Sequence, residues 1–265
     1  MPFIDRRPGS LARERVDRDR ASGNVPMCIR ADTPSGYVLD RARRSATRTN
    51  SNAGGDDTPF TSVLCGFDRS VNSRAARDQA ALFASPGGTV KLVPAPHLTH
   101  HGDRALRDAC AGHDLLALGA DAGAFRAVGR VSIPLLIARW CPLPSEVAST
   151  ILVAVDGSPE SGRAVELAGR LAAAHRGSVV LVAAPPRDPA LERAIAASRR
   201  ILVRTTGAAP RLICEQLPPE EAIRAAAYAF TASLVVLGTG HSENARRTAA
   251  QLASRVGSSV LAIPA

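Results

Sequence analysis

Apolar residues in this chain gather into short runs separated by longer amphipathic stretches. Runs of about four to eight apolar residues bounded by turn formers are typical of buried β-strands. Nine such runs are predicted as strands, at 63–67, 89–93, 114–118, 134–138, 151–155, 178–183, 211–214, 234–237 and 259–263. Amphipathic periodicity and end signals predict helices after 156 (stopped by Gly177), at 189–203, from Pro218 onward and at 242–256. Strands that alternate with helices predict an α/β fold with a parallel sheet.

One short pattern occurs twice, 88 residues apart. In each copy an apolar run ends on an aspartate, Asp68 or Asp156, and serines follow two and five positions later. A repeat at this distance indicates two similar domains rather than a solenoid, whose repeats are about 20 to 50 residues long. The corresponding glycines Gly119 and Gly238 lie 31 residues further apart than the repeat itself. The first copy is therefore expected to lack one helix and its third strand.

The segments outside the two copies predict the domain boundaries. Residues 1–60 are rich in arginine and show little apolar periodicity, so we expect a basic, mostly irregular N-terminal arm. The two domains are expected at 61–140 and 150–265, joined by a linker at 141–149.

The composition indicates a cytoplasmic protein. The N-terminus lacks the apolar core of a secretory signal, and no stretch approaches the roughly 20 apolar residues of a membrane span. We therefore expect no membrane partner. The five cysteines are widely spaced and form no Cys-x-x-Cys pair, which argues against a disulfide framework and a metal site.

The net charge of +9 raises the question of nucleic-acid binding. Aromatic residues make up only 3% of the chain, so the stacking platforms of single-strand binders are missing, and nucleic acid is not expected as a partner. Lys91 is the only lysine and lies in an apolar run, which excludes a Walker-type phosphate loop.

Three segments of the second copy carry a family signature. They read ILVAVDGSPES at 151–161, ASLVVLG at 232–238 and GSSVLAIP at 257–264. These segments resemble the first, fourth and last strands of universal stress protein domains. The whole chain resembles a tandem universal stress protein of the bacterial type with a truncated first domain.

The resemblance implies two open parallel-sheet, Rossmann-like domains of strand order 3-2-1-4-5, the first of them without strand three. Domains of this family pair through their last strands, which implies that 134–138 and 259–263 meet in an intramolecular pseudo-dimer. The sequence neither predicts nor excludes a homodimer, and it identifies no protein partner.

The resemblance also implies a ligand crevice between Asp156 and Gly238, which end the first and fourth strands of the second copy. In ATP-binding members the matching aspartate contacts the adenosine, and a longer glycine-rich loop holds the phosphates at a helix N-terminus. Here the helix is expected to begin at Ser242, two residues after Gly240, so the phosphate loop is lost. No required cofactor is expected. ATP or AMP are candidate ligands, with Asp156, Gly238, Gly240 and Ser242 as the binding residues.

Asp156 has a second interpretation that needs no ligand. An aspartate two residues before a serine forms an Asx turn, and Ser158 would then cap the following helix. The other chemistry-bearing side chains are interpreted as solvated loop residues rather than metal ligands. They are His97, His100, His101, Cys110 and His113.

No arrangement of nucleophile, base and acid is recognisable, so no catalytic residue is predicted. The function that fits best is a non-enzymatic stress-response regulatory protein that acts by ligand or partner binding. Two alternatives stay open. One is an adenine-nucleotide-binding stress protein with at most weak hydrolysis, and the other is a structural interaction module recruited through the basic N-terminal arm.

Overall fold

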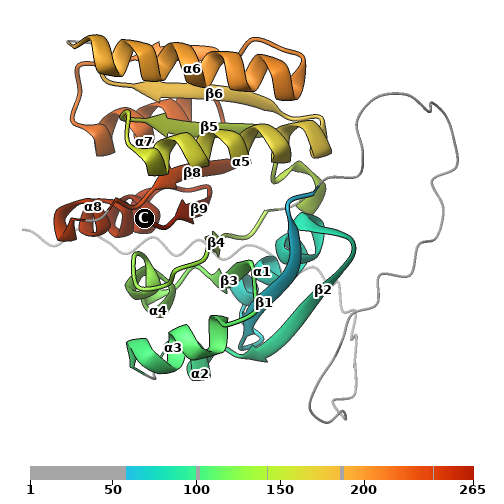
Figure 1. Ribbon diagram of the computed structural model, residues 1–265. Helices are drawn as coiled ribbons and strands as arrows, with labels where there is room; N and C mark the ends of the chain where they lie inside the picture. Colours follow the sequence, from blue (N-terminus) through green and yellow to red (C-terminus); the bar gives the residue numbers. More distant parts are fainter. Residues whose placement is uncertain (1–57, 100–101, 142, 186–187, 241) are drawn as a thin grey trace, which may run out of the picture. The chain divides into compact units, whose positions relative to one another are not determined.

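The computed structural model describes residues 58–99, 102–141, 143–185, 188–240 and 242–265 (Figure 1). The predicted N-terminal arm lies outside the described residues up to residue 57. The first strand begins at Phe60, whose side chain is 3% exposed, so the folded part includes the last residue assigned to the arm.

Strands and helices alternate along the described chain. The first half, from Phe60 to Ala138, contains β1 (Phe60–Phe67), α1 (Val71–Phe83), β2 (Ala84–Pro94), α2 (Ala95–Thr99), α3 (Asp103–Cys110), β3 (Leu115–Gly119), α4 (Ala122–Ala127) and β4 (Leu135–Ala138). A short 3-10 helix (Pro144–Glu146) follows. The second half contains β5 (Thr150–Val155), α5 (Pro159–His175), β6 (Ser178–Ala183), α6 (Pro189–Thr206), β7 (Arg211–Cys214), α7 (Pro219–Ala229), β8 (Leu234–Gly238), α8 (Glu243–Arg255) and β9 (Ser259–Ile263).

The nine strands of the described residues belong to one sheet in the order β2-β1-β3-β4-β9-β8-β5-β6-β7. Within the second half this is the order 3-2-1-4-5 with parallel neighbours, as predicted. The first half has the same order without a third strand, because α2 and α3 alone connect β2 to β3.

The two halves meet through their last strands. β4 and β9 pair antiparallel, with Leu136 opposite Leu261 at the centre of the pairing. The predicted contact between 134–138 and 259–263 is therefore confirmed. The pairing leaves neither last strand as an open edge, which removes a template for unwanted strand addition.

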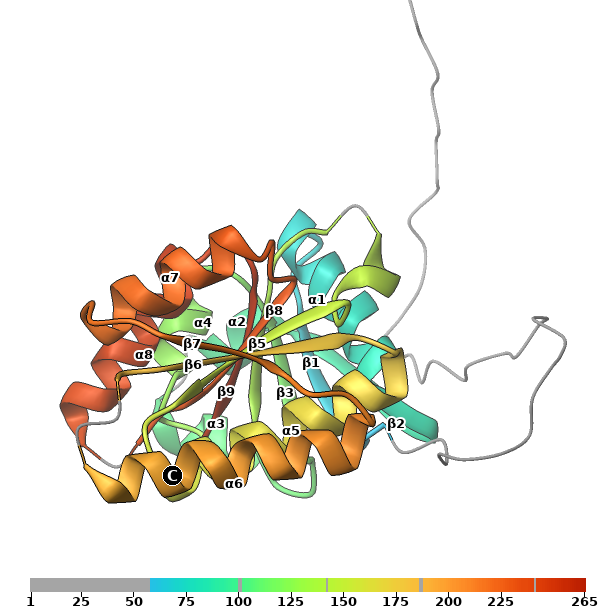
Figure 2. The same cartoon turned by 90° about the horizontal axis from the view of Figure 1, so that it is seen from above.

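Helices cover both faces of the sheet, so the strands are buried on both sides and read as continuous apolar runs. In β1, Val63 and Cys65 face the core that contains α1 and α5, whereas Leu64 faces the core that contains α3, α7 and α8. Figure 2 shows α6 and α7 on opposite sides of β6 and β7. No helix of the described residues combines the length and apolar character that spanning a membrane requires.

Several local predictions need correction. Gly177 is not the left-handed residue that ends α5: Arg176 takes that conformation at φ 56°. Gly177 is needed for a different reason, because a Cβ at this position would collide with the backbone oxygen of Ala148. β2 begins at Ala84, before the predicted start at 89, and the register to β1 shifts at this point.

The cysteine and histidine predictions are also only partly right. Cys214 is exposed on the edge strand β7, whereas Cys65 is buried in β1. His97 and Cys110 lie in short helices rather than in a loop. His113 Nδ1 lies 2.8 Å from Ser62 Oγ. His100 and His101 lie outside the described residues, and the described part of the chain contains no group of three or more possible metal ligands.

Candidate ligand-binding site

Asp156 forms a closed turn after β5. Its Oδ1 accepts hydrogen bonds from Ser158 N at 2.9 Å and from Ser158 Oγ at 2.6 Å. Ser158 Oγ in turn accepts from Ser161 N at 3.1 Å and caps α5. The Asx turn with a capping serine is therefore confirmed, and it accounts for the aspartate-serine spacing without a ligand.

The first half repeats this turn. Ser70 N donates to Asp68 Oδ1 at 2.9 Å, and Ser70 Oγ accepts from Ser73 N at 3.1 Å to cap α1. The repeated sequence pattern is thus a repeated helix start. Any function specific to Asp156 must come from its surroundings.

The glycines opposite the two turns allow close packing. A Cβ on Gly238 would lie 2.7 Å from Glu160 Cβ, and one on Gly119 would lie 2.7 Å from Ser73 N. In both halves the first turn of the helix after the first strand rests on this glycine. Gly238 and Gly119 therefore fix the distance between helix and sheet.

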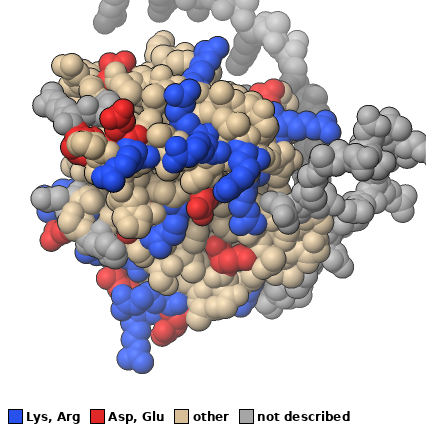
Figure 3. Space-filling view, turned by 45° about the horizontal axis from the view of Figure 1, so that its top comes forward, with Lys and Arg blue, Asp and Glu red and all other residues tan. Residues whose placement is uncertain are grey.

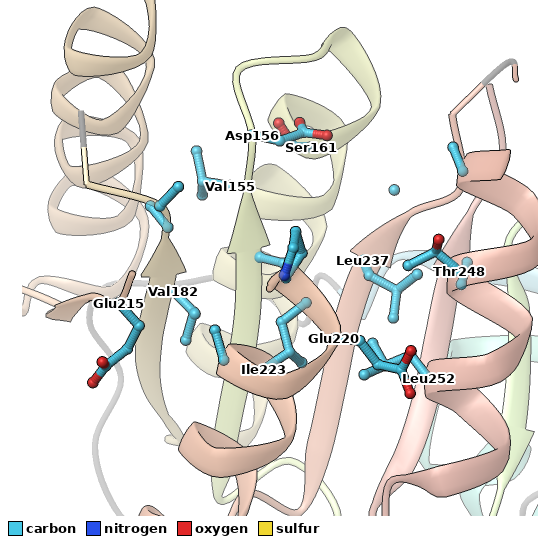
Figure 4. Close-up of a pocket in the computed structure, with 18 of the residues that line it drawn as sticks. Val155, Asp156, Ser161, Val182, Glu215, Glu220, Ile223, Leu237, Thr248 and Leu252 are labelled. Carbon is cyan, nitrogen blue, oxygen red and sulfur yellow. The ribbon is translucent and has the colours of Figure 1, made fainter. Parts of the chain in front are cut away.

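A cavity of about 370 Å³ opens beside Asp156 and Gly238, at the carboxyl ends of β5 and β8. It extends between β6, β8, α7 and α8, and most of its lining residues are aliphatic. Figure 4 shows Asp156 and Ser161 at one end, with Val182, Ile223 and Leu237 further along the cavity. The structure therefore brings Asp156 and Gly238 to one crevice, as predicted, at the topological switch of the second half.

The charged groups of this cavity are acidic. Three carboxylates line it, those of Asp156, Glu215 and Glu220. Glu220 Oε1 is 2.7 Å from Arg255 Nη1, so its charge is balanced at the rim. Burial beside the apolar wall raises the pKa of Asp156, but hydrogen bonds from Ser158 and Ser161 outweigh this effect and hold the pKa below its usual value. Asp156 is therefore ionised at neutral pH.

Positive charge gathers elsewhere. Figure 3 shows Lys and Arg side chains over the face that carries α5 and α6. The exposed arginines of these two helices are Arg163, Arg170, Arg193, Arg199, Arg200 and Arg204. Among the described residues that line the cavity at Asp156, none is a lysine, arginine or histidine. The described lining therefore offers no cation to a phosphate.

Gly240 and Ser242 lie apart from this cavity. Gly240 has φ +62° and lines a separate space of about 270 Å³ with Arg107, Arg130 and Arg246. Ser242 Oγ accepts from Ala245 N at 3.1 Å and caps α8. Of the four predicted binding residues, the structure places only Asp156 and Gly238 on the wall of the same cavity.

The far wall of the cavity was not predicted from the sequence. Glu215 follows β7 directly, and Glu220 lies in the first turn of α7. The helix dipole favours an acidic residue in the first turn of a helix, so Glu220 needed no functional explanation. The positions of Glu215 and Glu220, just after a strand and at the start of the next helix, could have indicated this wall, because the carboxyl ends of parallel strands meet at one edge of the sheet.

Comparisons with known proteins place this fold in a family. Residues 148–264 match the model of the Universal stress protein family. A universal stress protein family member from Burkholderia pseudomallei is 30% identical, over 45% of this chain and 98% of its own length, with a TM-score of 0.34. No match was found among curated proteins.

Two archaeal structures extend the comparison. The crystal structure of a universal stress protein from Archaeoglobus fulgidus DSM 4304 has a TM-score of 0.61 at 14% identity and covers 77% of this chain and 96% of its own. A universal stress protein from Archaeoglobus fulgidus in complex with dAMP is 22% identical over 43% of this chain and 96% of its own, with a TM-score of 0.36. Together with the family match, the 30% identity to the Burkholderia protein over nearly its full length shows that this chain belongs to the universal stress protein family.

Proposed function

We propose that this chain is a non-enzymatic regulatory member of its family, and that its second half binds adenosine or adenosine monophosphate in the cavity beside Asp156. The observation that carries the proposal is the lining of that cavity, whose described residues are mostly apolar and include three carboxylates but no cation. The two halves are proposed to be the domains 61–140 and 150–265, with 141–149 as linker.

The lining favours a ligand with an apolar body and neutral hydroxyl groups. The volume of about 370 Å³ lies in the range of roughly 300 to 1,000 Å³ that small-molecule sites occupy. A ribose hydroxyl can donate to the ionised carboxylate of Asp156, and a hydrogen bond to a charged group contributes about 1.5 to 3 kcal/mol. The planar base would then lie against aliphatic side chains such as Val182 and Leu237.

The same lining disfavours ATP. Each phosphate adds negative charge near the carboxylate of Asp156, and two like charges about 4 Å apart repel by about 1 to 4 kcal/mol, depending on solvent access. The segment between β8 and α8 is short: β8 ends at Gly238 and α8 begins at Glu243. Affinity is therefore expected to fall from adenosine to AMP to ATP.

Calorimetric titration of the full chain with adenosine, AMP and ATP tests this proposal. Asp156→Ala should weaken adenosine binding about tenfold or more, since the lost charge-assisted hydrogen bond exceeds the 1.4 kcal/mol that corresponds to one decade. Asp68→Ala is the matched control, because it removes the same turn from the first half and leaves the cavity intact.

The proposal is refuted if ATP binds more tightly than adenosine. It is also refuted if Asp156→Ala and Asp68→Ala change binding equally, or if none of the three compounds releases or absorbs heat at millimolar concentration.

A further inference from the structure

A second cavity lies where the chain leaves β4. It measures about 340 Å³ and is lined by residues of α1 together with Trp140 and Cys141. Two of its apolar side chains are mostly exposed, Trp140 at 63% and Val71 at 58%. Cavities of this size with an aromatic wall and a few polar groups are the usual form of small-molecule sites.

Comparison of the two halves explains why this cavity exists. α1 and α5 begin 88 residues apart, so Ala75 takes the place that Arg163 has in the second half. Arg163 Nη2 reaches past the end of β9 and donates to Pro264 O at 2.6 Å. Ala75 is too short for this contact. The first half therefore lacks the long side chain that covers the equivalent position in the second half.

A different residue satisfies the matching carbonyl of the first half. Arg139 follows β4 as Pro264 follows β9, and its backbone oxygen accepts from Gln79 Nε2 at 2.9 Å. This contact uses the amide nitrogen of Gln79. The Gln79 side chain is 1% exposed, and its Oε1 is buried without a hydrogen-bond partner. Gln79 therefore lines the cavity, but its amide oxygen is enclosed by the protein.

The cavity also carries a free positive charge. Arg74 is exposed, and no carboxylate among the described residues forms an ion pair with it. The nearby acid is already balanced, since Asp78 Oδ1 lies 2.8 Å from Arg77 Nη2. An aromatic face, a free guanidinium and the partly exposed carboxylate of Asp78 therefore surround one space of about 340 Å³.

We propose that this cavity binds a small hydroxylated aromatic carboxylate. Its ring packs against Trp140, its carboxylate pairs with Arg74 and its hydroxyl donates to the carboxylate of Asp78. An aromatic ring against the indole gains from offset stacking, and a carboxylate forms charge-assisted hydrogen bonds with a guanidinium. This site is separate from the cavity at Asp156 and does not depend on the function proposed for it.

Trp140 makes the test direct, because it is the only tryptophan of the chain. Covering an exposed indole moves its emission to shorter wavelength, so the full chain is titrated with 4-hydroxybenzoate while Trp140 emission is recorded. Two related compounds each lack one group: benzoate lacks the hydroxyl and 4-hydroxybenzamide lacks the charge. Each is expected to bind roughly tenfold more weakly than 4-hydroxybenzoate, because each loses one strong hydrogen-bonding contact.

Two substitutions assign the contacts. Arg74→Gln should lower the affinity for 4-hydroxybenzoate about tenfold and leave that for 4-hydroxybenzamide unchanged, since only the acid uses the guanidinium. Ala75→Arg supplies the side chain that the second half has and should abolish binding of all three compounds. Arg170→Gln, which removes an exposed arginine of α5, is the matched control and should change nothing.

Saturable binding that depends on Arg74 supports the site. A response that rises linearly without saturation overturns the proposal, as does an Arg74→Gln variant that behaves like Arg170→Gln. Ala75 is buried, so folding of Ala75→Arg is checked by circular dichroism. If that variant does not fold, the affinities of Arg74→Gln for 4-hydroxybenzoate and 4-hydroxybenzamide decide whether the proposal holds.

Discussion

Arg139, at the end of the first half, caps α8 of the second half, so its replacement should weaken the contact between the two halves. Its Nη2 donates to Ala253 O at 2.9 Å and to Ser254 O at 3.0 Å, at the C-terminal end of α8. Its guanidinium carbon lies 5.9 Å from the ring centroid of Phe125, and its backbone N donates to Ser259 Oγ at 3.1 Å. Arg139→Ala removes the side-chain contacts and keeps the backbone contact.

The size of the effect follows from these contacts. Hydrogen bonds to a charged group contribute about 1.5 to 3 kcal/mol each, and a cation over an aromatic ring about 0.5 to 1 kcal/mol at a partly exposed site. The guanidinium also has a buried Nε without a hydrogen-bond partner, which costs about 1 to 3 kcal/mol. Burial lowers the pKa of Arg139 below its usual value. Because the site is partly exposed, the lower value of each contribution applies, and the net loss in Arg139→Ala should be about 2 to 3 kcal/mol in the free energy of unfolding.

Scanning calorimetry of the full chain measures this loss. For a folded part of this size, 1 kcal/mol changes Tm by about 2 to 4 °C, so Arg139→Ala should lower Tm by about 4 to 12 °C. Arg247→Ala is the control, since Arg247 forms only an exposed pair with Glu243 at 3.2 Å on the same helix. That pair contributes about 0.3 to 0.5 kcal/mol, which corresponds to a change in Tm of at most about 2 °C. If Arg139→Ala and Arg247→Ala lower Tm equally, Arg139 does not stabilise the contact between the two halves.

Four further changes test other parts of the structure. Gly238→Ala should destabilise the chain by about 1 to 3 kcal/mol, because its Cβ would be forced against α5, and chemical denaturation measures the loss. Asp188→Ala removes the cap that accepts from two backbone N–H groups of α6 and should cost about 1 kcal/mol in the same assay, whereas no change would contradict a capping role. The pKa of Asp156 is lowered in the folded chain, so its contribution to stability is present above its unfolded pKa and is lost as pH falls through the folded pKa. Asp156→Asn should therefore flatten the fall in stability between about pH 5 and pH 2. Burial raises the pKa of the Cys65 thiol to about 12, so iodoacetamide at mildly alkaline pH should label the exposed Cys214 in the native chain and leave Cys65 unlabelled, as mass spectrometry of peptides would show.

The parts of the fold that the sequence predicted best are the ones that local pattern determines. β6, β7 and β9 have the predicted bounds, because each is an apolar run with polar or turn-forming residues on both sides. β2 was predicted too short, since its first residues include a proline and two glycines. Ala84 pairs with Phe60 across a shifted register, so this end of the strand depends on a partner distant in the sequence.

The candidate site was predictable only in part, for a similar reason. Asp156 and Gly238 end neighbouring strands of one parallel sheet, so topology alone brings them together. Glu215 follows β7 and reaches the same edge of the sheet for the same reason, whereas Glu220 reaches the cavity because α7 packs over the sheet, which no local pattern specifies. Gly240 follows Gly238 by two residues, yet it has φ +62° and lines a different space.

The repeated turn and the cavity follow from different requirements of the fold. Both halves keep the aspartate, the capping serine and the glycine opposite, because each half must start a helix against its sheet. The far wall of the cavity in the second half comes from elements that the first half lacks, namely the start of α6 and the segment after β7, which contribute Leu191, Glu215 and Leu217. Restoring a ligand site in the first half would therefore require a third strand and its helix. A change at Asp68 alone could not create one, which is why Asp68 can serve as the control for Asp156.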